Sequence, residues 1–265
     1  MRNQSGLLSE LLSKATRAVL VGTLLLTAAC VTTTNAPEQN ADLKKAEQTH
    51  ISAGEGYLRR GDKDSARRHF SKALTYDVNS AGANNGIALV YQLEQEWSLA
   101  EEHFRRALRA DPKFAQARNN YGLFLYSQQR YPEAIEQLRI AAEDVEYPNR
   151  HAALANMGIT QLKMGQTDEA VRSLKQAVSI HYRLPAAHIE LAEIYYTRRE
   201  YALSRFHYGQ YIKMVSRQSS RSLWLGIRLE RVFGDKDKEA SYSLALKNLY
   251  PYSEEYLQYK QSLKK

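Results

Sequence analysis

Histidine is the residue type in this chain with the widest choice of chemistry, because an imidazole can bind a metal or transfer a proton near neutral pH. The chain has seven histidines in 265 residues. Three of them recur at equivalent places, each one residue before an aromatic: His69, His103 and His207. Packed helices lie about 10 Å apart, so equivalent residues of successive helices are too distant to share one ion. We therefore expect these three side chains to point outward into solvent.

The other residues show no pattern of a metal site or a catalytic centre. His50, His151, His181 and His188 have no HExxH or similar ligand spacing. The sequence contains no glycine-rich phosphate loop and no GxSxG motif, and its one cysteine has no second thiol to pair with. We expect no enzymatic activity, no cofactor, no metal and no small-molecule substrate.

That one cysteine, Cys30, ends an apolar run that begins at Ala18. Twelve apolar residues are too few to span a bilayer, and the cations Arg2, Lys14 and Arg17 before them are typical of an export signal. Residues 1–29 are therefore predicted to be a signal peptide. An exported protein meets no nucleic acid, so the net charge of +8 does not indicate nucleic-acid binding.

Small residues directly before a lone cysteine resemble the signal of bacterial lipoproteins, in which the cysteine is acylated and becomes the N-terminus. Cys30 is the lipid-attachment site under this interpretation, although Thr27 stands where such signals usually carry leucine. Val31 follows where an aspartate would resemble the inner-membrane retention signal, which favours a periplasm-facing anchor in the outer membrane of a Gram-negative bacterium. The alternative is ordinary cleavage after Ala29, which leaves a free thiol.

The elements that must position any site are predicted by a repeat of about 34 residues. Between Trp97 and Pro112, Ala100, Phe104 and Ala107 give a small, large, small spacing. The first small residue of this spacing recurs as Ala66, Ala134, Ala170 and Ser204. A further small residue precedes each of these by 12 positions: Gly54, Ala88, Gly122, Gly158 and Ala192. A fixed period of this size indicates stacked copies of one helix pair, with the small residues at the close helix contacts.

This pattern closely resembles the tetratricopeptide repeat, which implies an all-α solenoid with a right-handed superhelix. We expect a lipidated cysteine and flexible tether over residues 30–40, with the first helix starting near Asn40 or Asp42. About six repeats should fill residues 41–252, the sixth being a looser copy near Gly226 and Ala240. A final helix over residues 253–265, capped by Ser253, should cover the last apolar face.

The first helix of each repeat should turn one face toward the concave side of the superhelix. Counting in steps of three and four along these helices gives a mostly apolar face with carboxamides and few charges. We expect a protein-binding groove lined by Ile51, Leu58, Asn85, Leu89, Asn119, Leu123, Tyr126 and Ile159. The alternatives are that the apolar residues pack between repeats and that the two asparagines form local bonds inside the helix pair.

Four segments carry a more specific resemblance, to the type IV pilus biogenesis lipoproteins of the PilF/PilW family. They are ACVTT at the lipid site, NNYGLFLYSQQRYPEA (119–134), REYALSRFHY (199–208) and SRSLWLGIRLERVF with SYSLALKNLYPYSEEY (220–256). The resemblance implies a lipoprotein that uses the groove of its early repeats to help the pilus secretin reach the outer membrane and form its ring. The partners are then the secretin and outer-membrane lipid. The alternative is a periplasmic adaptor for a cell-wall enzyme or a protease.

Overall fold

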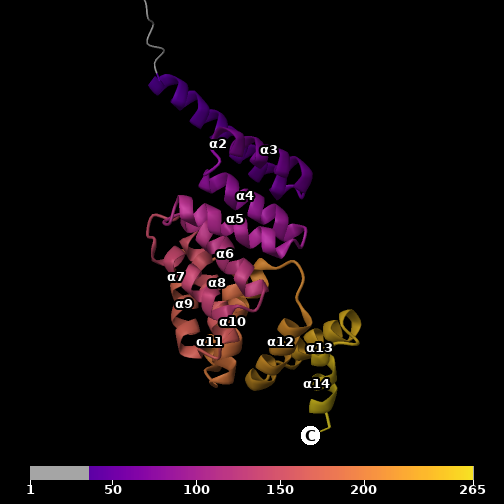
Figure 1. Ribbon diagram of the computed structural model, residues 1–265. Coiled ribbons are helices and arrows are strands. Elements are labelled where there is room, and N and C mark those ends of the chain that lie inside the picture. Colours follow the sequence, from indigo (N-terminus) through magenta and orange to yellow (C-terminus); the bar gives the residue numbers. More distant parts are fainter. Residues whose placement is uncertain (1–35, 265) are drawn as a thin grey trace, which may run out of the picture. The chain divides into compact units, whose positions relative to one another are not determined.

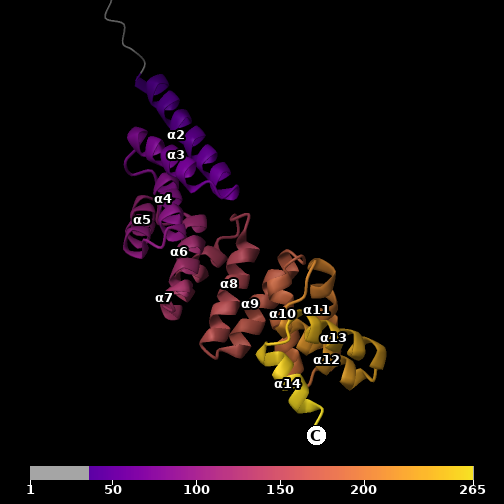
Figure 2. The same ribbon diagram turned by 90° about the vertical axis from the view of Figure 1, so that its right-hand side faces the viewer.

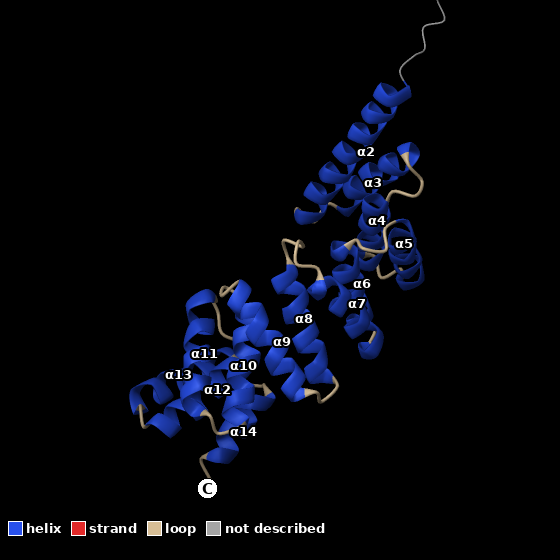
Figure 3. Cartoon of the chain, turned by 90° about the vertical axis from the view of Figure 1, so that its left-hand side faces the viewer, coloured by secondary structure: helices blue, strands red, loops and turns tan. Residues whose placement is uncertain are grey.

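The computed structural model describes residues 36–264, and this part of the chain is helical without a strand (Figure 3). The expected lipid site Cys30 and the signal peptide lie outside the described residues. The helices follow one another along the chain as shown in Figure 1. They are α2 (Ala36–Arg59), α3 (Lys63–Tyr76), α4 (Ala81–Leu93), α5 (Trp97–Ala110), α6 (Ala115–Ser127), α7 (Tyr131–Glu143), α8 (Arg150–Lys163), α9 (Thr167–Ile180), α10 (Pro185–Thr197), α11 (Tyr201–Met214), α12 (Ser220–Phe233), α13 (Lys236–Leu249) and α14 (Glu254–Ser262).

The contacts between residues group the chain into compact units with a boundary between Thr49 and His50. The helices after this boundary belong to one unit. Within it α4 pairs with α5, α6 with α7, α8 with α9, α10 with α11, and α12 with α13. Each first helix also contacts the first helix of the next pair, from α4 to α12. This is the packing of a tetratricopeptide solenoid, and it confirms the all-α repeat fold.

The predicted close contacts between paired helices are confirmed. The large residues of the repeat spacing, from Phe70 to Tyr208, are at most 2% exposed. A Cβ added at Gly122 would lie 2.6 Å from Leu138 Cγ, and one added at Gly158 would lie 2.7 Å from Leu174 Cγ. The helices approach so closely that a larger side chain has no room, which is why this position is small in every copy.

The turn inside each pair requires one residue in the left-handed conformation. Gly61, Gly165 and Gly234 supply it with φ between 73° and 78°, as glycine does without steric cost. The same position in the other pairs is held by Gln95, Gln129 and Arg199 with φ between 60° and 62°. A side chain makes this conformation costlier by about 1 kcal/mol, so these three turns are held by the packing of the helices around them.

The start of the first helix differs from the expectation. Helix α2 begins at Ala36, whereas the sequence indicated a flexible tether up to residue 40. Pro37 did not end the helix, because proline is well suited to a helix's first turn, where its missing N–H has no partner to lose. Among the described residues no helix is long and apolar enough to cross a membrane.

The second helix of the sixth pair starts one residue later than the repeat period predicts. Ala240 was expected at the small position of this pair, but it is exposed, and α13 instead buries Ser243 and Leu246. The turn at Gly234 comes 35 residues after Arg199, one more than the usual spacing. The extra residue lies before the turn, so α13 keeps the usual register: Ser243 and Leu246 stand 9 and 12 residues after Gly234, as Phe70 and Ala73 do after Gly61. The predicted cap of α14 is confirmed, since Ser253 Oγ accepts from the backbone N–H of Tyr256 at 3.2 Å.

Candidate protein-binding face

The face formed by the first helices contains one position that differs between the middle and late repeats. It directly follows the small residue of each first helix and is occupied by Leu89, Leu123, Ile159 and Glu193 in α4, α6, α8 and α10. Because the helices share one register, these residues occupy the same place on successive neighbouring helices. The middle repeats therefore present a row of three aliphatic side chains, and the row ends at a glutamate. We call Leu89, Leu123 and Ile159 the aliphatic row.

The chain leaves this row only partly covered. Leu123 is 38% exposed, although leucine is usually buried. Leu89 and Ile159 are half-buried against the cores on either side. Tyr126, one turn beyond Leu123, is also half-buried and packs on Tyr131 with ring centroids 5.5 Å apart. An apolar row with this exposure is a surface that a protein segment could cover.

Three of the residues predicted to line the groove are buried instead. Ile51, Asn85 and Asn119 are 6%, 3% and 7% exposed, so they offer little surface to a partner. Ile51 packs in the first core cluster with Phe70, and Leu58 lies half-buried at its edge. The neighbouring first helices pack against this side of each helix and bury it. The periodicity of a single helix cannot show which side is buried in this way.

The two asparagines connect successive helix pairs. Asn120 Nδ2 in α6 donates to Asn85 Oδ1 in α4 at 3.1 Å, and Asn156 Nδ2 in α8 donates to Asn119 Oδ1 in α6 at 3.0 Å. These bonds run between repeats, so they are neither the expected contacts to a peptide backbone nor bonds inside one helix pair. They fix the spacing of α4, α6 and α8 beneath the aliphatic row.

Gln92 marks a second place where the chain leaves this face incomplete. Its Oε1 is the one buried side-chain nitrogen or oxygen among the described residues that has no hydrogen-bond partner. Gln92 lies one turn after Leu89 in α4, at the position that Tyr126 holds in α6. A buried acceptor without a donor costs free energy, which an N–H group brought close to it would recover.

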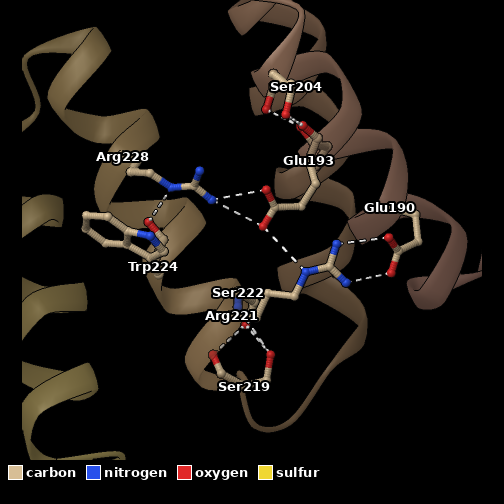
Figure 4. Close-up of polar contacts among 10 residues, drawn as sticks. Glu190, Glu193, Ser204, Ser219, Arg221, Ser222, Trp224 and Arg228 are labelled. Carbon is tan, nitrogen blue, oxygen red and sulfur yellow. Dashed lines mark hydrogen bonds and ion pairs between the residues drawn. The ribbon is translucent and has the colours of Figure 1, made fainter. Parts of the chain in front are cut away.

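The late repeats close the same face with ion pairs (Figure 4). Arg221 of α12 donates to both carboxylate oxygens of Glu190 in α10, at 2.7 and 2.9 Å. Arg228 donates to both oxygens of Glu193, at 3.1 and 3.3 Å, and Arg221 Nε lies 3.6 Å from the same carboxylate. Arg228 also lies over the rings of Tyr196 and Trp224. Tyr196 is the α10 equivalent of Tyr126, so an arginine lies here over a ring position that has no cation over it in α6 among the described residues.

The prediction that His69, His103 and His207 point outward is wrong. His207 is only 8% exposed, and the other two are half-buried. Each stacks on or tilts against a tyrosine of the first helix of its own pair, and these tyrosines are Tyr57, Tyr91 and Tyr195. Each also contacts a polar residue 19 positions earlier, namely His50, Asn84 and His188. The sequence held a signal for this, because tyrosine stands 12 residues before the position only where histidine occupies it.

The pair of His188 and His207 has a defined proton arrangement. His188 Nε2 lies 2.8 Å from the carbonyl oxygen of Tyr182, which can only accept, so Nε2 carries the proton. His188 Nδ1 is then an acceptor, and His207 Nδ1 donates to it at 2.9 Å. Burial lowers the pKa of His207 to about 4, helped by the neighbouring His188 and Lys175. Among the described residues no three histidine, cysteine or acidic side chains are close enough together to hold a metal ion.

Comparison with known proteins agrees with this arrangement. The tetratricopeptide repeat model matches residues 52–112, 94–150 and 156–217. The type IV pilus assembly protein PilF of Pseudomonas aeruginosa is 38% identical over 215 residues, which are 81% of this chain and 85% of PilF. A solved structure of P. aeruginosa PilF is 39% identical with a TM-score of 0.81, and the match covers 83% of this chain and 99% of that one.

A second solved structure is that of PilW, described as a widely conserved type IV pilus biogenesis factor. It is 28% identical with a TM-score of 0.68, over 80% of this chain and 97% of PilW. Tetratricopeptide repeats are a scaffold that binds other proteins. The chain therefore belongs to the tetratricopeptide repeat family and, within it, to the PilF and PilW group of type IV pilus biogenesis proteins.

Proposed function

We propose that this chain is an outer-membrane lipoprotein that binds the type IV pilus secretin and promotes its localisation and multimerisation. One observation carries the proposal: in a chain related to PilF over most of its length, the middle repeats leave an aliphatic row partly exposed. A tetratricopeptide scaffold acts by holding another protein, and this row is the surface on which it would do so.

The row is suited to hold an apolar segment of the secretin. Removing apolar surface from water contributes about 25 cal/mol per Å², so even a short segment laid over Leu89, Leu123 and Ile159 gains several kcal/mol before the cost of ordering it. The asparagine bonds beneath the row hold the three helices in place before the partner arrives. A surface that is already ordered loses less entropy on binding.

The lipid anchor supports the same role by keeping the chain at the membrane where the secretin assembles. One acyl chain gives only marginal attachment, so stable anchoring at Cys30 requires the several chains of a bacterial lipoprotein. The intact mass of the mature protein tests this directly. An unmodified thiol at Cys30 would contradict the lipoprotein part of the proposal, and Cys30→Ser should release or mislocalise the chain.

The function itself is tested by a clean deletion and by capture of the secretin. We expect the deletion strain to lose heat-resistant secretin multimers and surface pili, and the lipidated wild-type chain to retain secretin from solubilised envelopes. Normal multimers and pili in the deletion strain would contradict the proposal. Retention of a cell-wall enzyme or a protease in place of the secretin would support the adaptor alternative.

A further inference from the structure

A pocket on the second helices of the fourth and fifth pairs is separate from the aliphatic row. It has a volume of about 400 Å³, and its lining includes Lys175, Tyr182, His188, Phe206 and His207. These residues come from α9, the loop after it, α10 and α11, which lie side by side in Figures 1 and 2. The aliphatic row belongs to the first helices α4, α6 and α8, so the pocket is a second surface.

Phe206 breaks the repeat pattern at this pocket. It stands two residues after the small residue of α11 and is 56% exposed. The same position in the earlier pairs carries an exposed charged residue, and these are Arg68, Glu102, Glu136 and Arg172. Tyr182, which also lines the pocket, is 64% exposed. Two exposed aromatic rings line one pocket, and one of them stands at a position that is charged in the other pairs. This indicates a surface that binds a partner.

The floor of the pocket carries no charge. His188 and His207 satisfy each other through their Nδ1 atoms, and burial lowers the pKa of both, so they are neutral at pH 7. A neutral floor between aromatic walls suits a large apolar side chain. A concave pocket of this size suits a protruding side chain better than it suits a flat lipid surface.

The charge around the pocket has one sign. No aspartate or glutamate occurs in residues 171–184 or 201–218, the segments that supply nearly the whole lining. Lys175, Arg183 and Lys213 are exposed in these segments and form no ion pair with any described residue. An acidic partner would therefore be attracted to this surface and a basic one repelled.

We propose that this pocket binds an acidic segment of a partner protein, with one large apolar side chain inserted between Tyr182 and Phe206. The carboxylates of the segment lie near Lys175 and Arg183. The site does not depend on the aliphatic row, so one chain can hold two protein segments at once.

Phage selection tests the proposal without requiring that the partner be identified. A random dodecapeptide library is first depleted on Phe206→Glu and then selected on the full wild-type chain in detergent. That variant is compatible with the fold, because Glu102 and Glu136 occupy the same repeat position. We expect enriched peptides in which an aromatic or large aliphatic residue stands among acids. The affinity of a labelled selected peptide should fall about tenfold or more with Phe206→Glu, as expected for loss of a central anchor, and with Lys175→Glu.

Leu203→Glu is the matched control, because Leu203 is an exposed apolar residue of α11 that does not line the pocket. It should leave the affinity unchanged, and added salt should weaken the wild-type complex. Enrichment of basic or uncharged peptides, or equal binding by Phe206→Glu, would overturn the proposal. So would displacement of the peptide by phosphatidylglycerol vesicles but not by phosphatidylcholine vesicles, since the surface would then bind lipid headgroups.

Discussion

The middle and late repeats use the same helix pair but close their first-helix face in opposite ways. The middle repeats place Leu89, Leu123 and Ile159 where the fifth repeat has Glu193, and Glu193 is held by two arginines of α12. Both Tyr126 and its equivalent Tyr196 are half-buried, but Arg228 lies over the ring of Tyr196, and among the described residues no cation lies over that of Tyr126. A solenoid can thus repeat one core while the surface differs from repeat to repeat. One segment then stays open for a partner, and the next is covered by the chain's own side chains.

If the middle and late repeats differ only at their surface, the same kind of core lies beneath both faces. Charged substitutions in that core should have the largest effect on stability. Ala134→Glu in the third pair and Ser204→Glu in the fifth should each cost several kcal/mol of unfolding free energy, because both positions are fully buried at the closest helix contact. Denaturant unfolding followed by circular dichroism measures the loss. Glu102→Ala, at an exposed position, is the control and should change the stability by less than about 0.5 kcal/mol. Equal losses in all three variants would mean that the repeat register is wrong.

The histidine pair should make the late repeats sensitive to acid. The unfolded chain protonates His207 near its ordinary pKa of 6.5, whereas the folded chain does so only near pH 4. Between these values only the unfolded state takes up the proton, so stability falls as the pH falls, by about 3 kcal/mol in total. His207→Gln should flatten this part of the profile of unfolding free energy against pH. An unchanged slope in the variant would show that the pair does not control the acid response.

The two faces should also differ in their response to salt. Glu193→Ala removes a carboxylate shared by two partly exposed arginines, and Asn119→Ala removes an uncharged bond between α6 and α8. Each should cost about 1 kcal/mol. The cost of Glu193→Ala should shrink in high salt because the ion pairs are screened, and that of Asn119→Ala should not. The same salt dependence for both would remove the electrostatic distinction between the faces.

The smallest effect concerns the turns that lack glycine. Gln129→Gly should raise the unfolding free energy by about 0.5 kcal/mol, because φ of 60° at this residue is strained for a side chain and free for glycine. The turn of the fourth pair already has Gly165 at this place, so Gly165→Gln should lower the stability by a similar amount. The thermal midpoint reports both changes. A loss of stability in Gln129→Gly would show that its side chain contributes contacts that outweigh the strain.

The repeat was predictable from the sequence because close helix contacts require small residues at fixed positions. Gly122 and Gly158 are small because Leu138 and Leu174 press on them, and this constraint recurs in every copy. The left-handed turn position could be predicted only in some pairs, because glycine occupies it there, whereas Gln95 or Arg199 occupies it in others. Strain that is supported by the surrounding packing leaves no signature in the local sequence.

The site was less predictable because a helical face does not reveal which neighbour covers it. Asn85 and Asn119 lie on the expected helices, but they are buried by the next repeat and bonded to it. Counting along one helix cannot show this, since the bonding partner lies about one repeat later. The aliphatic row could have been found by comparing the copies, because Leu89, Leu123, Ile159 and Glu193 occupy one repeat position.

The most direct test of a binding face on the middle repeats exchanges the residues at this repeat position between the middle repeats and the fifth. Leu89→Glu combined with Leu123→Glu gives the middle repeats the residue of the fifth, and Glu193→Leu gives the fifth repeat the residue of the middle ones. Circular dichroism first confirms that both proteins are folded. Lipidated chains are then used to capture secretin from detergent-solubilised envelopes.

We expect the double variant to lose secretin by about tenfold or more, since charge replaces the apolar centre of the interface. Glu193→Leu should retain the wild-type amount. Secretin held normally by the folded double variant but lost by Glu193→Leu would contradict a binding face on the middle repeats and would place it on the late repeats.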